Sequence, residues 1–264
     1  TQTSSNSVVF VANSFWNFYN YRKELISLFV EKEYQVILVA PYDEYYNRIP
    51  FFQAQFIIWR HCQASSLNPI KEIQSLLSLT ILLFKIRPDY IFSFTIKANI
   101  YSGLINFLLQ TNHYPTITGI GRYFIKILYA LGLNTSKKVF FQNYSDATLF
   151  IKEKITSEKK AIILPGSGVN PAIFKPTYKI TFPNTFLFVS RFPFEKGLNH
   201  IIEASLLLKE SHPDWSIDFY GYPSQHYFKL PKNIIYKGFS QLMAQIYPQY
   251  GCFLYCSAYR EGLP

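Results

Sequence analysis

Short apolar runs alternate with longer amphipathic stretches along almost the whole chain, and this alternation constrains the fold most. The apolar runs are rich in β-branched and aromatic residues, and helical spacing follows most of them. The runs in the first part of the chain are Ser7–Ala12, Gln35–Ala40, Gln55–Trp59, Asp89–Phe94, Pro115–Thr118, Lys138–Gln142 and Ala161–Leu164. Strands that alternate with helices are typical of a doubly wound parallel sheet with helices on both faces. The sequence therefore predicts an α/β protein.

A stretch rich in proline and glycine interrupts the alternation. Residues 165–183 contain four prolines and two glycines, which is typical of a linker between domains. Strand and helix patterns then resume with Thr185–Ser190, Gly197–Ser211 and Trp215–Tyr220. We predict two Rossmann-like domains, residues 1–178 including the linker and residues 179–264. The second has few elements for a doubly wound domain, so it is expected to be incomplete.

The chain is basic, and its excess charge lies mainly in the first part. The net charge is +10, and residues 1–178 carry 18 Lys and Arg against 10 Asp and Glu. A basic surface attracts nucleic acid, anionic lipid or diphosphate groups. No aromatic-basic RNA motif or helix-turn-helix pattern is visible, so no nucleic-acid partner is expected. An ordinary solvated surface is the alternative to lipid and diphosphate binding.

Cysteine usage and hydropathy indicate a cytoplasmic protein. Cys62, Cys252 and Cys256 form no CxxC pair and are too few for a disulfide framework. The last two lie in a run that predicts a buried strand, Cys252–Cys256. The polar opening residues predict no signal peptide, and no apolar run approaches the roughly 20 residues that cross a bilayer. The predicted helix Tyr123–Leu133 either packs on the sheet or rests peripherally on the inner membrane face.

One loop of the second domain has the charge that a diphosphate requires. Arg191 and Lys196 follow the strand Thr185–Ser190, and Gly197 begins a helix. Ligands bind beyond the carboxyl ends of strands in open α/β sheets, and a helix N-terminus there favours an anion. An arginine and a lysine add positive charge. We interpret the loop as a diphosphate site; an exposed basic loop is the alternative.

Several residues of the first domain are candidate contacts for the ligand that carries this diphosphate, here called the donor, or for a second substrate, here called the acceptor. Gly166, Ser167 and Gly168 follow a predicted strand, so their backbone either approaches the donor or forms a hinge. Lys97 follows the strand Asp89–Phe94 and either faces the donor or lies on the surface. The residues that we expect near an acceptor follow two other strand ends: Asn13, Asn17, Tyr21 and Arg22 after the first strand, and Gly119, Gly121 and Arg122 at a turn into a helix.

The run FLFVSRFPFEKGLNHIIEASLLLKESHPDWSIDFYG, residues 186–221, resembles the phosphate-binding segment of glycosyltransferase family 4. The final SAYREGLP resembles the start of that family's paired-glutamate motif, in which Glu261 matches the first glutamate and the second falls at position 269, beyond the sequence. The runs SFTIKANIYSGL, TITGIG, VFFQN and LPGSGVNPAIF are similar to a subgroup that extends polyprenyl-diphosphate-linked saccharides. The resemblance covers nearly the whole chain and implies two Rossmann-like domains, the GT-B fold.

The resemblance also implies a reaction and residue roles. A hexose or N-acetylhexosamine would move from a nucleotide sugar, expected to be UDP-linked, to the lipid-linked saccharide with retention at the anomeric carbon. Arg191 and Lys196 would neutralise the departing diphosphate, and Glu261 would lie near the donor sugar. Relatives often place a histidine where this chain has Lys97. The sequence contains no DxD pair, so no metal and no cofactor are expected.

Other functions fit the same fold, because a fold does not decide a function. A nucleotide-sugar epimerase would release a free sugar without an acceptor. A glucosyltransferase with a soluble acceptor would need no lipid. A fragment without the second glutamate would be inactive or nearly so.

Overall fold

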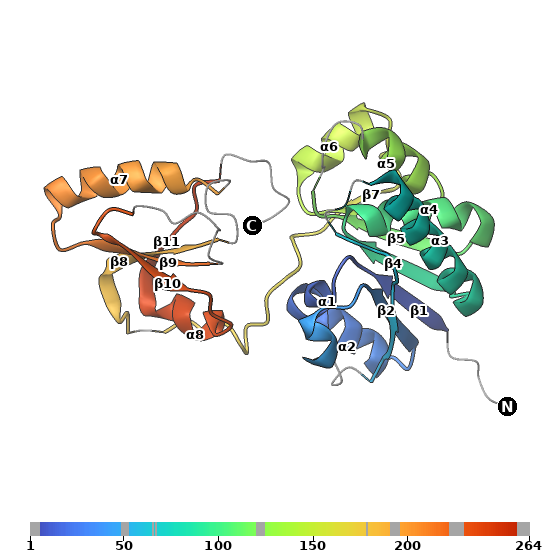
Figure 1. Ribbon diagram of the computed structural model, residues 1–264, viewed down its shortest axis with the longest axis horizontal. Coiled ribbons are helices and arrows are strands. Elements are labelled where there is room, and N and C mark those ends of the chain that lie inside the picture. The colour runs from blue at the N-terminus through green and yellow to red at the C-terminus, as the bar shows by residue number, and fades with distance from the viewer. Residues whose placement is uncertain are drawn as a thin grey trace. The chain divides into compact units, whose positions relative to one another are not determined.

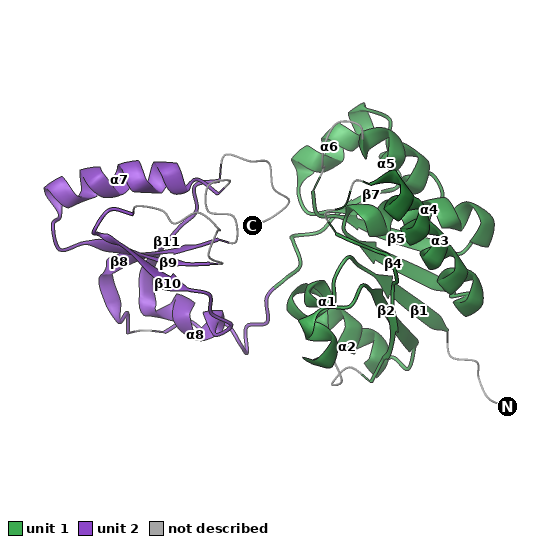
Figure 2. Ribbon diagram, in the orientation of Figure 1, with its two compact units in different colours: residues 1–168, 261–264 green, residues 169–260 purple. Residues whose placement is uncertain are grey.

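The computed structural model describes residues 6–48, 53–64, 66, 68–119, 125–177, 179–190, 196–221 and 230–257. The chain forms two compact units, one ending at Gly168 and the next beginning at Val169 (Figure 2). Each unit contains a parallel sheet with helices packed on it (Figure 1). The predicted α/β class is confirmed. The chain passes from one unit to the next inside the proline- and glycine-rich stretch that predicted the linker.

The first unit is built on a sheet whose described strands are all parallel. They are β1 (Ser7–Val11), β2 (Gln35–Ala40), β3 (Gln55–Ile58), β4 (Tyr90–Phe94), β5 (Asn112–Ile117), β6 (Val139–Phe141) and β7 (Ala161–Ile163). Their order is β3-β2-β1-β4-β5-β6-β7. The winding reverses at β1, which lies between β2 and β4. In open sheets, ligands bind at the carboxyl ends of the strands where this reversal occurs.

Helices cover both faces of this sheet (Figure 1). One face carries α1 (Phe15–Tyr21) and α2 (Lys23–Glu31), and the other carries α3 (Pro69–Ile86), α4 (Ile96–Leu109), α5 (Ile125–Leu133) and α6 (Tyr144–Lys152); a 3-10 helix, η1 (Glu44–Arg48), follows β2. Along β1, Val8 and Phe10 pack in the hydrophobic core between the sheet and α1 and α2. Val9 and Val11 pack in the core on the opposite face, between the sheet and α3 to α6. This alternation follows from the two-residue period of a strand, and it explains why β1 is apolar throughout.

The sequence predicted one helix over Phe18–Lys32, and this was wrong. The chain there forms α1 and α2, because Arg22 has φ −125° and ψ 6° and ends the first helix. The first helix also begins earlier than predicted, since the Ser14 hydroxyl accepts the backbone N–H of Asn17 at 3.2 Å and caps it. At this break Arg22 is only 6% exposed, whereas a position on the outer face of a continuous helix would be exposed to solvent.

His113 on β5 is a buried neutral group that makes stability depend on pH. Its Nε2 lies 2.8 Å from the Ser93 hydroxyl and its Nδ1 lies 3.0 Å from the Ser136 hydroxyl. Burial lowers the pKa of His113 from 6.5 to about 3. The unfolded chain therefore binds a proton between these values that the folded chain does not, so stability is lost as the pH falls below about 6.5.

We expect this loss to reach about 2 kcal/mol at pH 5, relative to pH 7. Urea unfolding of the wild type and of His113→Gln at both pH values measures it. The variant lacks the titrating ring, so its stability should change less between pH 7 and pH 5. An equal change in the free energy of unfolding of both proteins would contradict the assignment of His113 as a buried neutral group.

The second unit contains four described parallel strands in the order β10-β9-β8-β11. The strands are β8 (Phe182–Val189), β9 (Ser216–Tyr220), β10 (Ile234–Gly238) and β11 (Tyr250–Leu254), and the helices are α7 (Leu198–Ser211), α8 (Met243–Ile246) and the short η3 (Tyr247–Gln249). Phe188, Ile201 and Phe219 are core residues between α7 and the sheet. The predicted burial of Cys252 was wrong: it is exposed, because β11 is an edge strand among those described.

Candidate functional site

A pocket of about 280 Å³ opens beyond the carboxyl ends of β1, β4 and β5, where the winding of the first sheet reverses. It is lined by Asn13, Ala64, Thr95, Ile96, Lys97, Thr118 and Gly119. Three residues predicted from separate segments, Asn13, Lys97 and Gly119, therefore come together. The structure brings them to one place because each follows a strand that ends at the same edge of the sheet.

A larger cavity of about 440 Å³ lies at the opposite edge of this sheet. Its lining includes Arg87 and Asp89 before β4 and Thr111 before β5. None of the predicted site residues lines it. Because sites in open α/β sheets form at the carboxyl ends of strands, we assign function to the smaller pocket.

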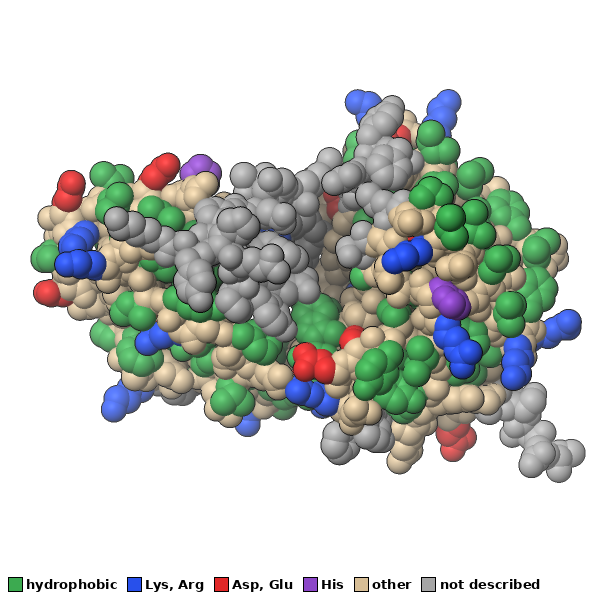
Figure 3. Space-filling view, in the orientation of Figure 1, with side chains coloured by type: hydrophobic (Ala, Val, Ile, Leu, Met, Phe, Trp, Pro, Cys, Tyr) green, Lys and Arg blue, Asp and Glu red, His purple; other side chains and the backbone are tan. Residues whose placement is uncertain are grey.

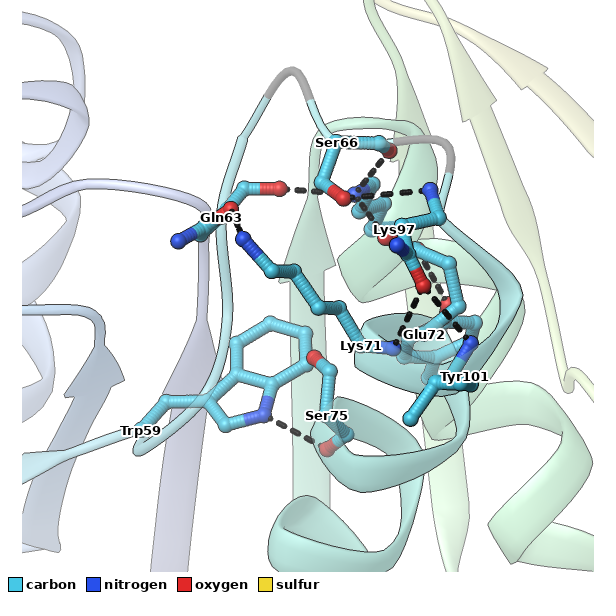
Figure 4. A network of polar contacts seen from close by, with 10 residues as sticks. Trp59, Gln63, Ser66, Lys71, Glu72, Ser75, Lys97 and Tyr101 are labelled. Atoms are coloured by element: carbon cyan, nitrogen blue, oxygen red, sulfur yellow. Dashed lines mark hydrogen bonds and ion pairs between the residues drawn. The ribbon is translucent and has the colours of Figure 1, made fainter.

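Lys97 is held by three polar partners (Figure 4). Its ammonium donates to the carbonyls of Gln63 and Ser66 at 2.6 and 2.7 Å, and to Glu72 Oε1 at 2.7 Å. The Tyr101 hydroxyl donates to the other oxygen of Glu72 at 2.6 Å. An ammonium has three N–H donors, and these bonds use all of them. In this arrangement Lys97 fixes the pocket wall, and its charge is matched by Glu72.

Thr95 lines the same pocket and has an unusual backbone conformation. Its φ is 83° and its ψ is 155°, a region that β-branched residues rarely occupy. Its side-chain oxygen is buried and has no hydrogen-bond partner among the described residues. Strain of this kind costs about 1–3 kcal/mol and concentrates at functional sites. An unsatisfied hydroxyl beside a helix start makes Thr95 a candidate ligand contact.

Replacing Thr95 separates backbone strain from side-chain chemistry. Thr95→Gly should raise the free energy of unfolding by about 0–1 kcal/mol relative to the wild type, since glycine adopts positive φ without strain. Thr95→Ala keeps the strain and serves as the matched variant without the hydroxyl. Urea midpoints of the three proteins provide the comparison. A glycine variant less stable than the alanine variant would contradict the strain.

Arg22 joins the end of β4 to the segment that follows β7. Its Nη1 donates to the Ser167 hydroxyl at 3.0 Å, and its guanidinium carbon lies 4.2 Å from the centre of the Phe94 ring. Gln142 Nε2, just after β6, donates to the same hydroxyl at 3.2 Å. Arg22 and Ser167, predicted as acceptor and donor contacts, are therefore in direct contact.

The buried charge of Arg22 has no carboxylate partner among the described residues. Burial lowers its pKa from 12.5 to about 10, so the guanidinium stays charged at neutral pH. Its Nε is also buried, and no described residue offers it a hydrogen-bond acceptor. A buried charge without a counter-ion is costly, and the Phe94 ring compensates only in part. Arg22 is thus suited to meet an anion at this edge of the sheet.

The other first-unit candidates occupy varied positions. Asn17 is buried, and its side-chain oxygen has no partner within the part of the chain that the structure describes; Tyr21 is 44% exposed and packs on the Trp16 ring. Gly166 and Gly168 have φ of 74° and 76°, the left-handed region that favours glycine on both sides of Ser167.

In the second unit, Lys196 is half-buried just before the N-terminus of α7. The next residue, Gly197, has φ 86°, and a Cβ there would lie 2.3 Å from the Cys256 carbonyl oxygen. Only glycine therefore lets the loop pass this close to the end of β11. Four predicted site residues, Arg191, Glu261, Gly121 and Arg122, lie outside the described residues.

Sequence reasoning missed Thr95, Thr118 and Gln142 as site residues. Each is the residue directly after the end of a strand. Their position was available as a signal, since polar residues at the carboxyl ends of parallel strands face the ligand edge. No sequence pattern predicts the positive φ of Thr95.

Comparison with known proteins gives relatives at low identity, and no family model matches. A curated relative from Campylobacter jejuni, N,N'-diacetylbacillosaminyl-diphospho-undecaprenol alpha-1,3-N-acetylgalactosaminyltransferase, is 22% identical over 228 residues, or 76% of this chain. The chain spans 60% of the length of that relative.

Solved structures match over both sheets. HepE from Anabaena, in complex with UDP and glucose, has a TM-score of 0.76 at 13% identity and covers 97% of this chain and 76% of its own. A glycosyltransferase from Rickettsia africae has a TM-score of 0.70 at 15% identity and covers 98% of this chain and 74% of its own. The fold is that of the GT-B glycosyltransferases. The GT-B fold that the resemblance implied is thereby confirmed.

Two features are absent from the described part of this GT-B chain. No described helix has the length and apolar character needed to cross a bilayer. Within the same residues, no three His, Cys, Asp or Glu side chains converge as metal ligands would.

Proposed function

We propose that this protein is a glycosyltransferase that moves a hexose or N-acetylhexosamine from a UDP-sugar to a polyprenyl-diphosphate-linked saccharide. The fold supports the enzyme class, since HepE, which was solved with UDP and glucose, matches 97% of this chain. The Campylobacter relative, whose name describes an acceptor of the undecaprenol-diphosphate type, supports the acceptor. The protein would act at the cytoplasmic membrane face, where such lipids present their headgroups.

The observation that carries the proposal is the buried Arg22 without a counter-ion among the described residues. An acceptor diphosphate supplies two negative charges at the edge where this guanidinium lies, next to the Ser167 and Gln142 pair. The pocket beyond β1, β4 and β5 would take the acceptor saccharide; it is lined by Thr95, whose hydroxyl has no hydrogen-bond partner among the described residues. Asn13, Asn17, Tyr21, Gly119, Gly121 and Arg122 complete the proposed acceptor side.

The donor would bind chiefly to the second unit. We assign its diphosphate to Arg191 and to Lys196, which lies just before α7, and its sugar to Glu261. The helix N-terminus and the two cations would stabilise the charge that develops as the diphosphate leaves. The sugar would pass through an oxocarbenium-like transition state with retention, without a metal or other cofactor. Gly166 and Gly168 would let the backbone approach the donor, and Lys97 would act by fixing the pocket wall.

A thermal-shift screen of UDP-, GDP- and ADP-sugars tests the donor. A ligand that binds only the folded state at about 100 times its Kd adds about 2.7 kcal/mol of stability. We expect UDP-sugars to raise the melting temperature by several degrees and GDP- and ADP-sugars to raise it little. Equal shifts for all three bases, or none, would contradict the proposed donor.

A further inference from the structure

The outer face of α3 is apolar although no described element covers it. Its exposed large apolar side chains recur at helical spacing on one face of the helix: Ile70, Ile73, Leu77, Ile81 and Phe84, with exposures of 69, 58, 56, 69 and 37%. We call these five residues the α3 stripe. Leu79 and Leu83 on the opposite face are buried against the sheet. A helix covered on one side normally presents polar residues outward, so the α3 stripe marks an interaction surface.

The apolar surface continues past the end of α3. Leu108 of α4 is 74% exposed and lines the 440 Å³ cavity together with Phe84. Figure 3 shows hydrophobic side chains gathered over α3 and α4, with lysine and arginine side chains at the margin. The surface is therefore wider than a single helix face.

The charges along the α3 stripe are cationic. Lys71 and Lys85 each follow a stripe residue by one position, so they lie along the same margin of the helix. Both are exposed, as is Arg87 at the helix end, and none of the three forms an ion pair among the described residues. The acidic residue of α3, Glu72, is already paired with Lys97.

We propose that the α3 stripe docks on an anionic lipid surface. An apolar face with a lysine margin is the pattern of a helix that lies in a membrane interface. The site adjoins the proposed acceptor pocket, because α3 begins at the wall that Lys97 and Glu72 hold. This inference rests on the proposed function: a surface that docks there presents the pocket to saccharides carried on membrane lipids.

The α5 helix is the weaker surface for the same contact. It exposes Ile127, Leu128 and Leu131, but its cation Lys126 is paired with Glu153. A neutralised lysine contributes little attraction to anionic headgroups. The predicted membrane contact through residues 123–133 is therefore better assigned to α3.

Vesicle flotation tests the surface directly. We expect the protein to float with vesicles of phosphatidylcholine containing about 30% phosphatidylglycerol, and less with pure phosphatidylcholine. Ile73→Ser/Leu77→Ser/Ile81→Ser should lower the partition coefficient at least about tenfold, since three apolar side chains lose their burial. Lys71→Gln/Lys85→Gln should remove most of the preference for anionic vesicles.

Leu206→Ser/Leu207→Ser on α7 is the matched control. These leucines are 52 and 68% exposed, so the same chemical change is made on another helix. We expect its partition coefficient to equal that of the wild type. Because the α3 stripe is exposed, the triple variant should also keep its melting temperature and its UDP-sugar thermal shift.

Leu77→Trp provides an independent readout that needs no loss of apolar surface. The fluorescence emission of the introduced tryptophan is obtained by subtracting the wild-type spectrum. On addition of vesicles it should shift to the blue, and lipids brominated on their acyl chains should quench it. The proposal would be overturned if the wild type did not float or if the triple variant floated equally well. It would also be overturned if the brominated lipids did not quench the introduced tryptophan. A dimer that depends on the stripe, in a protein that does not float, would overturn it as well. Lost donor binding with intact flotation would instead count against the proposed function.

Discussion

Gly103→Ala should destabilise the first unit by about 3 kcal/mol or more. A Cβ at Gly103 on α4 would lie 1.7 Å from the backbone oxygen of Gly132 on α5, and a Cβ at Gly132 would lie 2.8 Å from the Ile100 oxygen. Neither contact can relax by turning a side chain, because both involve backbone atoms. The helices would have to separate, and core residues such as Tyr129 would lose packing.

The sign of this effect separates packing from intrinsic helix propensity. Alanine is favoured over glycine within a helix by about 1 kcal/mol, so propensity alone predicts stabilisation. Gly119→Ala is the matched control, since a Cβ there would meet no atom of the described residues within 4 Å. Urea unfolding should show a large fall in midpoint for the first variant and little change for the second. Equal urea midpoints for Gly103→Ala and the wild type would contradict the close packing of α4 on α5.

Arg191→Gln/Lys196→Gln should weaken UDP-sugar binding at least about 100-fold. Each charge-assisted hydrogen bond to a diphosphate contributes about 1.5–3 kcal/mol, and two are removed. The fold should survive, because Lys196 is only half-buried. Titration calorimetry with UDP measures the affinity, and binding of uridine should change much less, since it carries no phosphate.

Lys209→Gln provides the control for charge removal in the same unit. Lys209 lies in the last turn of α7, at the far end of the helix from Lys196. We expect this variant to bind UDP as the wild type does. An unchanged affinity in the double variant, or an equal loss in Lys209→Gln, would remove the assigned diphosphate site.

The fold was largely predictable because its strands are buried on both sides. The runs that gave β1, β2 and β4 are apolar almost without interruption, a pattern that helices on both faces of a parallel sheet impose. The stretch rich in proline and glycine predicted a linker; the two units divide within it, after Gly168, whereas the sequence placed the domain boundary after residue 178. The break between α1 and α2 was not, because Arg22 is a good helix former whose burial beside Phe94 overrides its propensity.

The candidate site was predictable in position and less so in detail. Asn13, Lys97 and Gly119 were found because each follows a strand, and the topology then brings them to one pocket. The partners of Lys97 were not foreseeable, since Glu72 and Gln63 reach it from segments whose placement depends on the whole fold. The strain at Thr95 was hidden for the same reason.

The most direct test of the proposed function is a transfer assay with a radiolabelled UDP-sugar and a polyprenyl-diphosphate-linked saccharide. The account predicts that label moves to the organic-extractable lipid fraction when this acceptor is present, and that little free sugar is released without it. Release of free sugar at the same rate with and without the acceptor would indicate an epimerase or hydrolase. That result, or transfer to a soluble sugar in preference to the lipid, would contradict the account.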